Sequence, residues 1–228
     1  MPGFDRLVAK AAALLEDNID TDVILPARFL LRMDKAGLGD CLLADRRAAC
    51  VAMGTPFPLP NERDDRPAIL FAGAGFGCGS SREHAVWALA DYGIRAVIAP
   101  SFGEIFAGNA ARNGLAALRL DGQRISHFAA QWREEEFVID LVHLRITAPD
   151  GTTATVALPE DDRLALIKGW DEIDLILHHN GGAIAAFEQG RIERQAWLAA
   201  MLARGLPKTD QPSPHAGRPG IKPGSGRA

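Results

Sequence analysis

Gly73-Ala-Gly-Phe-Gly-Cys-Gly-Ser-Ser-Arg-Glu-His84 is the most informative stretch of this sequence. It follows an apolar run, residues 67–72, that predicts a buried strand, and it precedes residues 85–92, whose apolar spacing predicts a helix. Glycines at alternate positions let the backbone adopt positive φ angles and pass close to another surface. The order of strand, glycine loop and helix predicts a ligand site at the carboxyl end of the strand.

The helix is expected to begin at Ser80, because Ser80 and Glu83 have the spacing of a capping box, and to end at Gly93 in a left-handed cap. The free N–H groups and the positive dipole end of such a helix favour an anion, ideally a carboxylate. Arg82 adds a fork of donors that suits the same anion. A simpler interpretation stays open, in which Ser80 only caps the helix and Arg82 is a solvated first-turn residue.

The glycine spacing excludes the common nucleotide loops. The pattern is G-x-G-x-G-x-G, which contains no G-x-G-x-x-G in any register, and no Gly-Lys-Ser/Thr follows it. A G-x-S-x-G elbow for a hydrolase nucleophile is also missing. The stretch therefore predicts neither a dinucleotide site nor a serine hydrolase.

The composition is that of a globular protein, with 47% hydrophobic and 24% charged residues in a chain of 228. A net charge of −4 gives no indication of nucleic-acid binding. The longest N-terminal apolar run, Ala11–Leu15, is too short for a signal peptide or a membrane span, so we expect a cytoplasmic protein without a membrane partner. Residues 1–206 are expected to form one domain, and the proline- and glycine-rich residues 207–228 a disordered tail.

The three cysteines, Cys41, Cys50 and Cys78, are an odd number without a C-x-x-C pair. This pattern argues against a disulfide framework and against a self-contained zinc or iron–sulfur site. One thiolate in the glycine loop cannot hold a cluster, so Cys78 is interpreted as a small packing residue. We expect no metal to be bound by this chain alone.

The order of the predicted elements indicates an α/β protein. Residues 67–99 form a βαβ unit, which implies parallel strands with a right-handed crossover. Pro149-Asp-Gly151 predicts a hairpin turn, and hence an antiparallel part. We therefore expect a parallel central sheet with helices and a second, antiparallel layer. The further predicted strands are residues 7–15, 115–120, 137–146 and 152–158, and the further predicted helices are residues 102–113, 123–134 and 183–204.

Several short motifs resemble the small-subunit family of 3-isopropylmalate dehydratase, which is the swivelling-domain half of the aconitase superfamily. They lie in order across most of residues 7–190, and they are Asp17-Asn-Ile-Asp-Thr-Asp-Val-Ile-Leu-Pro26, Gly77-Cys-Gly-Ser-Ser-Arg-Glu-His84, Trp87-Ala-Leu, Asp91-Tyr-Gly, Ala99-Pro-Ser-Phe102 and Ala183-Ile-Ala-Ala-Phe-Glu188. The resemblance implies a swivelling β/β/α domain like the aconitase C-terminal domain. It also implies a hydro-lyase that interconverts 2-isopropylmalate and 3-isopropylmalate through 2-isopropylmaleate in leucine biosynthesis.

The same resemblance implies a partner. A separate large subunit would carry a [4Fe–4S] cluster, the active site would form between the two chains, and this chain would be active only in that heterodimer. The substrate would be a small dicarboxylate. The chemistry agrees with this division, because removing hydroxide calls for a Lewis-acid metal that this chain lacks the cysteines to hold.

The resemblance also assigns roles to single residues. Ser80 would be the base, supported by Arg82, and Ser81 would contact a substrate carboxylate with Arg82. Thr21 and Asp22 would lie near the active site, help to orient groups of the partner subunit and belong to the substrate-binding residues. A third group would border the loop that reads the variable side chain of the substrate, and its members are Arg28, Leu30, Leu31 and Arg32. An ordinary amphipathic helix over residues 27–33 remains an equally good interpretation of that group.

Two other functions stay open. The first is a related hydro-lyase subunit, homoaconitase-like or acting on methylmalate and citraconate. The second is an anion-binding module in which the helix N-terminus holds a carboxylate without any chemistry.

Overall fold

A computed structural model describes residues 3–31, 34–62, 65–132, 135–195, 197 and 200–201 of the chain. The chain divides into two compact units, Met1–His179 and Asn180–Ala228. Every strand and both hydrophobic cores lie in the first unit. Arg32 and the tail over residues 207–228 lie outside the described residues, so the predictions made for them stay predictions.

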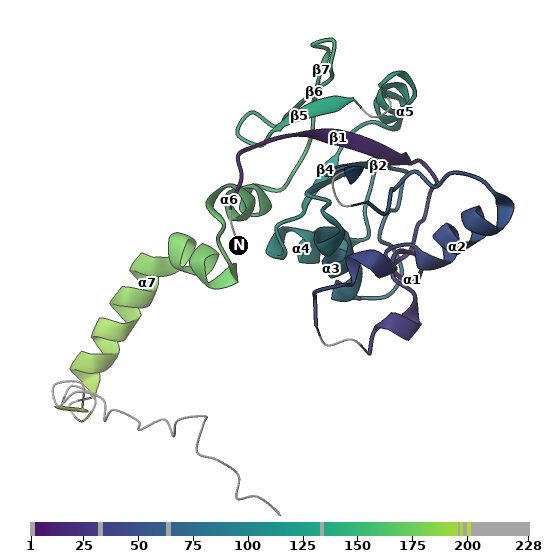
Figure 1. The fold of residues 1–228 in the computed structure, drawn as a ribbon. Coiled ribbons are helices and arrows are strands. Elements are labelled where there is room, and N and C mark those ends of the chain that lie inside the picture. The colour runs from purple at the N-terminus through teal and green to yellow at the C-terminus, as the bar shows by residue number, and fades with distance from the viewer. Residues whose placement is uncertain are drawn as a thin grey trace, which may run out of the picture. The chain divides into compact units, whose positions relative to one another are not determined.

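The first unit is built on one sheet of seven strands in the order β4-β3-β2-β1-β5-β6-β7 (Figure 1). Strands β1 to β4 pair in parallel, and β1, β5, β6 and β7 pair antiparallel. The bounds are β1 Arg6–Leu14, β2 Ile69–Ala72, β3 Ala96–Ala99, β4 Ala116–Arg119, β5 Glu136–Asp140, β6 Arg145–Thr147 and β7 Thr153–Thr155. The predicted α/β class, with a parallel and an antiparallel part, is confirmed.

Strand β1 joins the two parts of the sheet. It is nine residues long, whereas β2, β3 and β4 have four each. Its residues 11–14 pair with β2, and its residues 6–10 pair with β5. The antiparallel strands therefore continue the same sheet through this shared strand, instead of forming a separate layer.

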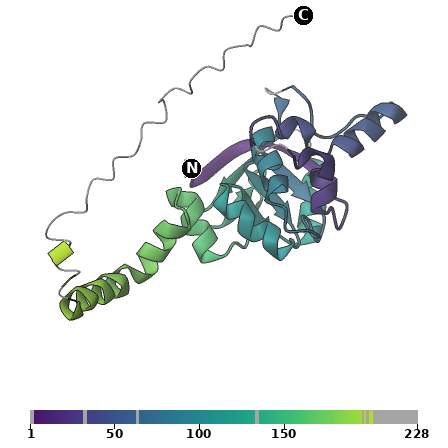
Figure 2. The same ribbon diagram turned by 90° about the horizontal axis from the view of Figure 1, so that it is seen from below.

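Helices cover both faces of the parallel strands. The bounds are α1 Thr21–Ile24, α2 Ala44–Met53, α3 Glu83–Tyr92, α4 Glu104–Arg112, α5 Gly122–Gln131, α6 Glu160–Lys168 and α7 Glu172–Arg194, with short 3₁₀ turns at Ala27–Phe29 and Gly39–Cys41. Figure 1 shows α3 and α4 on the opposite side of the sheet from α5. In Figure 2, α2 is the blue helix that extends outward from its unit, and none of its residues is buried.

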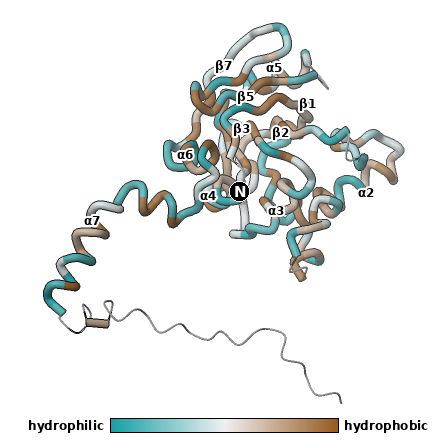
Figure 3. The backbone as a smooth tube through the Cα atoms, turned by 60° about the vertical axis from the view of Figure 1, so that its left-hand side comes forward, coloured by the Kyte–Doolittle hydropathy of each residue, from teal (hydrophilic) through white to brown (hydrophobic). Residues whose placement is uncertain are grey.

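The two hydrophobic cores follow from the alternation of side chains along the strands. In β2, Leu70 and Ala72 pack into the core with α3 and α4, while Ile69 and Phe71 pack into the core with α5. Phe71 meets Phe137 edge-on, with 5.1 Å between the ring centroids. Figure 3 shows hydrophobic residues gathered on the strands of the sheet. Burial on both faces explains why these strands read as continuous apolar runs.

Two predicted elements had wrong bounds, and two helices, α2 and α6, were not predicted. The strand expected over residues 137–146 is broken, because Leu144 adopts a φ of 49° and the Asp140 carboxylate accepts the His143 N–H at 2.9 Å. These local bonds form a turn between β5 and β6. Helix α7 begins at Glu172 instead of Ala183. The hairpin at Pro149-Asp-Gly151 is confirmed as the connection between β6 and β7.

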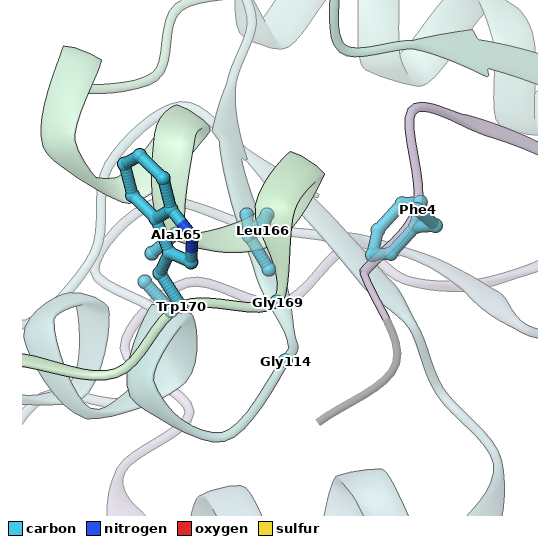
Figure 4. A pocket seen from close by; sticks show the side chains of 7 residues that line it. Phe4, Gly114, Ala165, Leu166, Gly169 and Trp170 are labelled. Atoms are coloured by element: carbon cyan, nitrogen blue, oxygen red, sulfur yellow. The ribbon is translucent and has the colours of Figure 1, made fainter. Parts of the chain in front are cut away.

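A small cavity lies beside the end of α6 and is separate from the glycine loop (Figure 4). Its lining carries no charged side chain and consists of Phe4, Ala111, Gly114, Ala165, Leu166, Gly169 and Trp170. Such a lining gives no charged group to hold a dicarboxylate. Among the described residues, no helix is long and apolar enough to cross a membrane.

Candidate active site

Two loops that follow neighbouring strands are joined by backbone hydrogen bonds. Residues 15–22 follow β1 and residues 73–82 follow β2, and we call them together the loop pair. The bonds extend the parallel pairing past the strand ends, and they are Gly73 N to Leu14 O at 3.2 Å, Asn18 N to Ala74 O at 2.7 Å, Gly77 N to Ile19 O at 2.8 Å and Thr21 N to Cys78 O at 3.0 Å. The acidic motif and the glycine motif therefore form one structure.

The glycines permit this close contact. Gly77 has a φ of +72°, and a Cβ there would lie 2.3 Å from the Phe106 ring, far inside van der Waals contact. A Cβ at Gly73 would lie 2.2 Å from the carbonyl oxygen of Glu16. Both positions need glycine because the neighbouring backbone or ring occupies the space that a side chain would fill.

Two polar side chains fix the glycine loop from outside. The carboxylate of Asp17 accepts the Ala74 N–H at 2.7 Å. The hydroxyl of Ser101, which precedes α4, accepts the Gly75 N–H at 2.9 Å. The loop is thus held both by the acidic motif and by the segment after β3, so its conformation is determined before any ligand binds.

Ser80 lies exposed at the end of the loop, and its carbonyl is held firmly. The hydroxyl of Thr21, which is only 2% exposed, donates to the Ser80 carbonyl at 3.0 Å. The N–H of Arg82 donates to the same carbonyl at 2.8 Å. Ser81 is also exposed. The structure therefore uses Thr21 to position Ser80, and its predicted contact with a substrate stays a prediction.

The predicted start of the helix at Ser80 was wrong. Helix α3 begins at Glu83, and its N-cap, Arg82, makes no side-chain capping bond. The Glu83 carboxylate accepts from the Asn113 amide at 2.7 Å instead of turning back toward Ser80. The tight turn between Ser80 and Arg82 keeps this segment out of the helix. The predicted left-handed cap at Gly93, with a φ of 118°, is confirmed.

Arg82 and Asp22 form an ion pair across the loop pair. Their side chains are 26% and 49% exposed, and the Arg82 Nη1 atom that makes the contact is itself buried. It fixes a guanidinium at the N-terminal end of α3, where the helix dipole also favours negative charge. Together with the exposed Ser80 and Ser81, this arrangement suits the binding of a carboxylate.

The described residues of the group expected to read the substrate, Arg28, Leu30 and Leu31, do not lie in an α-helix. Only a 3₁₀ turn, Ala27–Phe29, is present within the described part of residues 27–33. Arg28 pairs with Asp45 through bonds of 3.0 and 2.5 Å, which raises the pKa of Arg28 and lowers the pKa of the Asp45 carboxyl. Leu30 packs against the core, whereas Leu31 is 90% exposed. Leu31 is thus the apolar side chain of this group that is free to meet a ligand.

Sequence reasoning missed a cluster beside the first turn of α3. The His84 and Trp87 rings lie 4.5 Å apart, and the Lys35 ammonium lies 4.6 Å from the Trp87 ring centroid. Lys35 also donates to the Asn113 side-chain oxygen at 3.2 Å. His84 and Trp87 have helical spacing that could have indicated their contact. Nothing in the sequence links Lys35 or Asn113 to them.

The cysteines are free and come from different elements: Cys41 is buried, and Cys50 and Cys78 are half-buried. In the part of the chain that the structure describes, no three His, Cys, Asp or Glu side chains gather as a metal site.

Comparison with known proteins gives a consistent result. Residues 1–123 match the family described as the aconitase C-terminal domain. The 3-isopropylmalate dehydratase small subunit of Rhodospirillum centenum is 40% identical over 201 residues, which cover 86% of this chain and 98% of that protein. The Neisseria meningitidis small subunit is 38% identical over 213 residues, covering 87% and 99%. A crystal structure of 3-isopropylmalate dehydratase from Methanocaldococcus jannaschii has a TM-score of 0.58 at 24% identity, covers 80% of this chain and 99% of its own, and shows the shared fold.

Proposed function

We propose a catalytic role for this chain, which belongs to the aconitase C-terminal domain family and, within it, to the small subunits of 3-isopropylmalate dehydratase. Together with a large subunit in the cytoplasm, it interconverts 2-isopropylmalate and 3-isopropylmalate through 2-isopropylmaleate. The reaction is a dehydration followed by a rehydration, and it serves leucine biosynthesis.

The observation that carries this proposal is the agreement between the relatives and the loop pair. The relatives match this chain over nearly their whole length, so the proposal concerns the entire subunit and not one shared module. The loop pair holds Ser80, Ser81 and Arg82 at a helix N-terminus, which is the kind of site that a dicarboxylate requires. Family membership and site chemistry support the same substrate class.

The partner supplies what this chain lacks. The name of the relatives, small subunit, implies a large one. We place a [4Fe–4S] cluster on that large subunit, because the three cysteines here come from different elements. When bound, such a cluster supplies a Lewis acid for the hydroxyl and carboxylate of the substrate.

We assign the proton transfer and the binding of the substrate carboxylates to residues of this chain. Ser80 takes the proton from the carbon beside a substrate carboxylate and returns it to the neighbouring carbon. Negative charge builds up on that carboxylate as the proton leaves, and Arg82 and the α3 N-terminus stabilise it. Ser81 donates to a substrate carboxylate, and Asp22 orients Arg82 through their ion pair. Thr21 fixes the backbone of Ser80.

Specificity for the isopropyl group is assigned to the segment after Pro26. Leu31, 90% exposed, supplies the apolar surface. Leu30 supports it from the core, and Arg28 is held by Asp45. Arg32 is assigned to the same border.

The test is an assay of the reconstituted complex. The isolated chain should be inactive on 2-isopropylmalate, and adding a cluster-bearing large subunit should produce 3-isopropylmalate. Citramalate serves as the comparison substrate, because it lacks the isopropyl group. Turnover by the purified chain alone would contradict the two-subunit proposal, and a preference for citramalate would favour a related hydro-lyase.

A further inference from the structure

The Asn113 side chain connects three elements beside the proposed active site. Its amide nitrogen donates to the Glu83 carboxylate at 2.7 Å and to the Asn109 carbonyl at 2.9 Å. Its oxygen accepts from the Lys35 ammonium at 3.2 Å. Asn113 is the C-cap of α4, so this single amide ties the end of α4 to the start of α3 and to the segment that contains Lys35.

The charges around this amide are matched to its two ends. The amino group faces a carboxylate and the carbonyl oxygen faces an ammonium, which is the arrangement in which each end makes a charge-assisted hydrogen bond. Bonds that involve a charged group are stronger than bonds between neutral groups. The amide is therefore a specific bridge between Glu83 and Lys35.

The position of Glu83 gives this bridge its significance. Glu83 is the first residue of α3 and directly follows Arg82, which makes no side-chain capping bond. Lys35 reaches the next turn of the same helix by lying 4.6 Å from the Trp87 ring centroid. Asn113 and Lys35 thus contact side chains of the first two turns of α3.

We infer that Asn113 is a positioning residue, which sets Arg82 and the start of α3 relative to the segment that contains Lys35. The inference rests on the proposed function for its effect on catalysis. It adds a residue that touches no substrate and acts through Glu83. Losing Asn113 would leave Arg82 present and charged but less well placed for a carboxylate.

The experiment is a double-mutant cycle with Asn113→Ala and Glu83→Ala in the assembled complex. Each single variant should lower kcat/KM for 2-isopropylmalate about tenfold, mainly through KM. The double variant should be no worse than either single one, because both changes remove the same bond. Asp140→Asn is the control, since it removes the negative charge from the contacts to His143, at 2.9 and 2.7 Å, in the antiparallel part of the sheet. It should lower Tm and leave kcat/KM within twofold.

Hydrogen exchange on the isolated chain gives a second readout that does not depend on turnover. Asn113→Ala should raise amide exchange in residues 80–84 and 34–38, and Asp140→Asn should not. The inference would be overturned if kcat/KM of the double variant fell about a hundredfold, as independent effects would predict. Unchanged amide exchange at residues 80–84 in Asn113→Ala would overturn it as well. Where the wild-type complex fails to convert 2-isopropylmalate, the proposed function fails, and the exchange result alone decides the role of Asn113.

Discussion

Replacing Ser80 by alanine separates chemistry from stability at the centre of the proposed site. Ser80 is exposed and does not cap α3, and the bonds that hold it run to its carbonyl, which alanine retains. An exposed substitution of this kind changes the free energy of unfolding by no more than about 0.5 kcal/mol. A general base contributes roughly 10²- to 10⁴-fold to the rate. That loss corresponds to about 3–5 kcal/mol of transition-state stabilisation.

The assay measures Tm of the isolated chain and kcat and KM of the complex with its large subunit. Ser80→Ala should keep a normal Tm and normal pairing with the large subunit, and should lose at least a hundredfold in kcat. Ser81→Ala is the matched control, because Ser81 is also exposed and its proposed role is to bind the substrate, so KM should rise more than kcat falls. A Ser80→Ala complex that kept more than a tenth of the wild-type kcat would refute the assignment of Ser80 as the base.

Three further substitutions test how the site is held. Thr21→Val removes the hydroxyl that holds the Ser80 carbonyl, so the free energy of unfolding, measured with denaturant, should fall by about 1 kcal/mol and kcat should fall with it. An unchanged kcat would make Thr21 purely structural. Gly77→Ala forces a Cβ to within 2.3 Å of the Phe106 ring at a φ of +72°, so it should destabilise the chain by more than about 1 kcal/mol, and an unchanged urea midpoint would contradict the geometry of the loop pair. Leu31→Glu should leave Tm unchanged and lower kcat/KM for 2-isopropylmalate more than for citramalate, whereas an equal fall for both would remove Leu31 from substrate recognition.

The sequence was sufficient to predict the structure where short-range patterns determine it. The four apolar residues of β2 are buried on both faces, and after them Gly73 and Gly75 are required by close contacts with the neighbouring loop and Gly77 by the Phe106 ring. Gly93 ends α3 as expected, since only a residue that tolerates positive φ fits that position. The parallel strands and the position of the candidate site followed from these features.

The sequence was insufficient to predict the structure where a distant residue competes for a local hydrogen-bond partner. Ser80 and Glu83 have the spacing of a capping box, but Asn113, 30 residues further along the chain, binds the Glu83 carboxylate. The break between β5 and β6 depends on the Asp140 carboxylate taking the His143 N–H and on Leu144 at positive φ, neither of which the apolar pattern of residues 137–146 reveals. Tertiary contacts decided both cases.

The loop pair separates the residues that build the site from those that would use it. Four backbone amides in the loop pair donate to carbonyls of the opposite segment, and they belong to Asn18, Thr21, Gly73 and Gly77. The Asp17 and Thr21 side chains also make hydrogen bonds inside the pair. Ser80 and Ser81 remain exposed at its edge, with a half-buried Arg82 beside them. Substitutions of the buried members should therefore change folding and activity together, while substitutions of the exposed serines should change activity alone. Exposed serines at the edge of the loop pair agree with the proposal that a large subunit completes the active site.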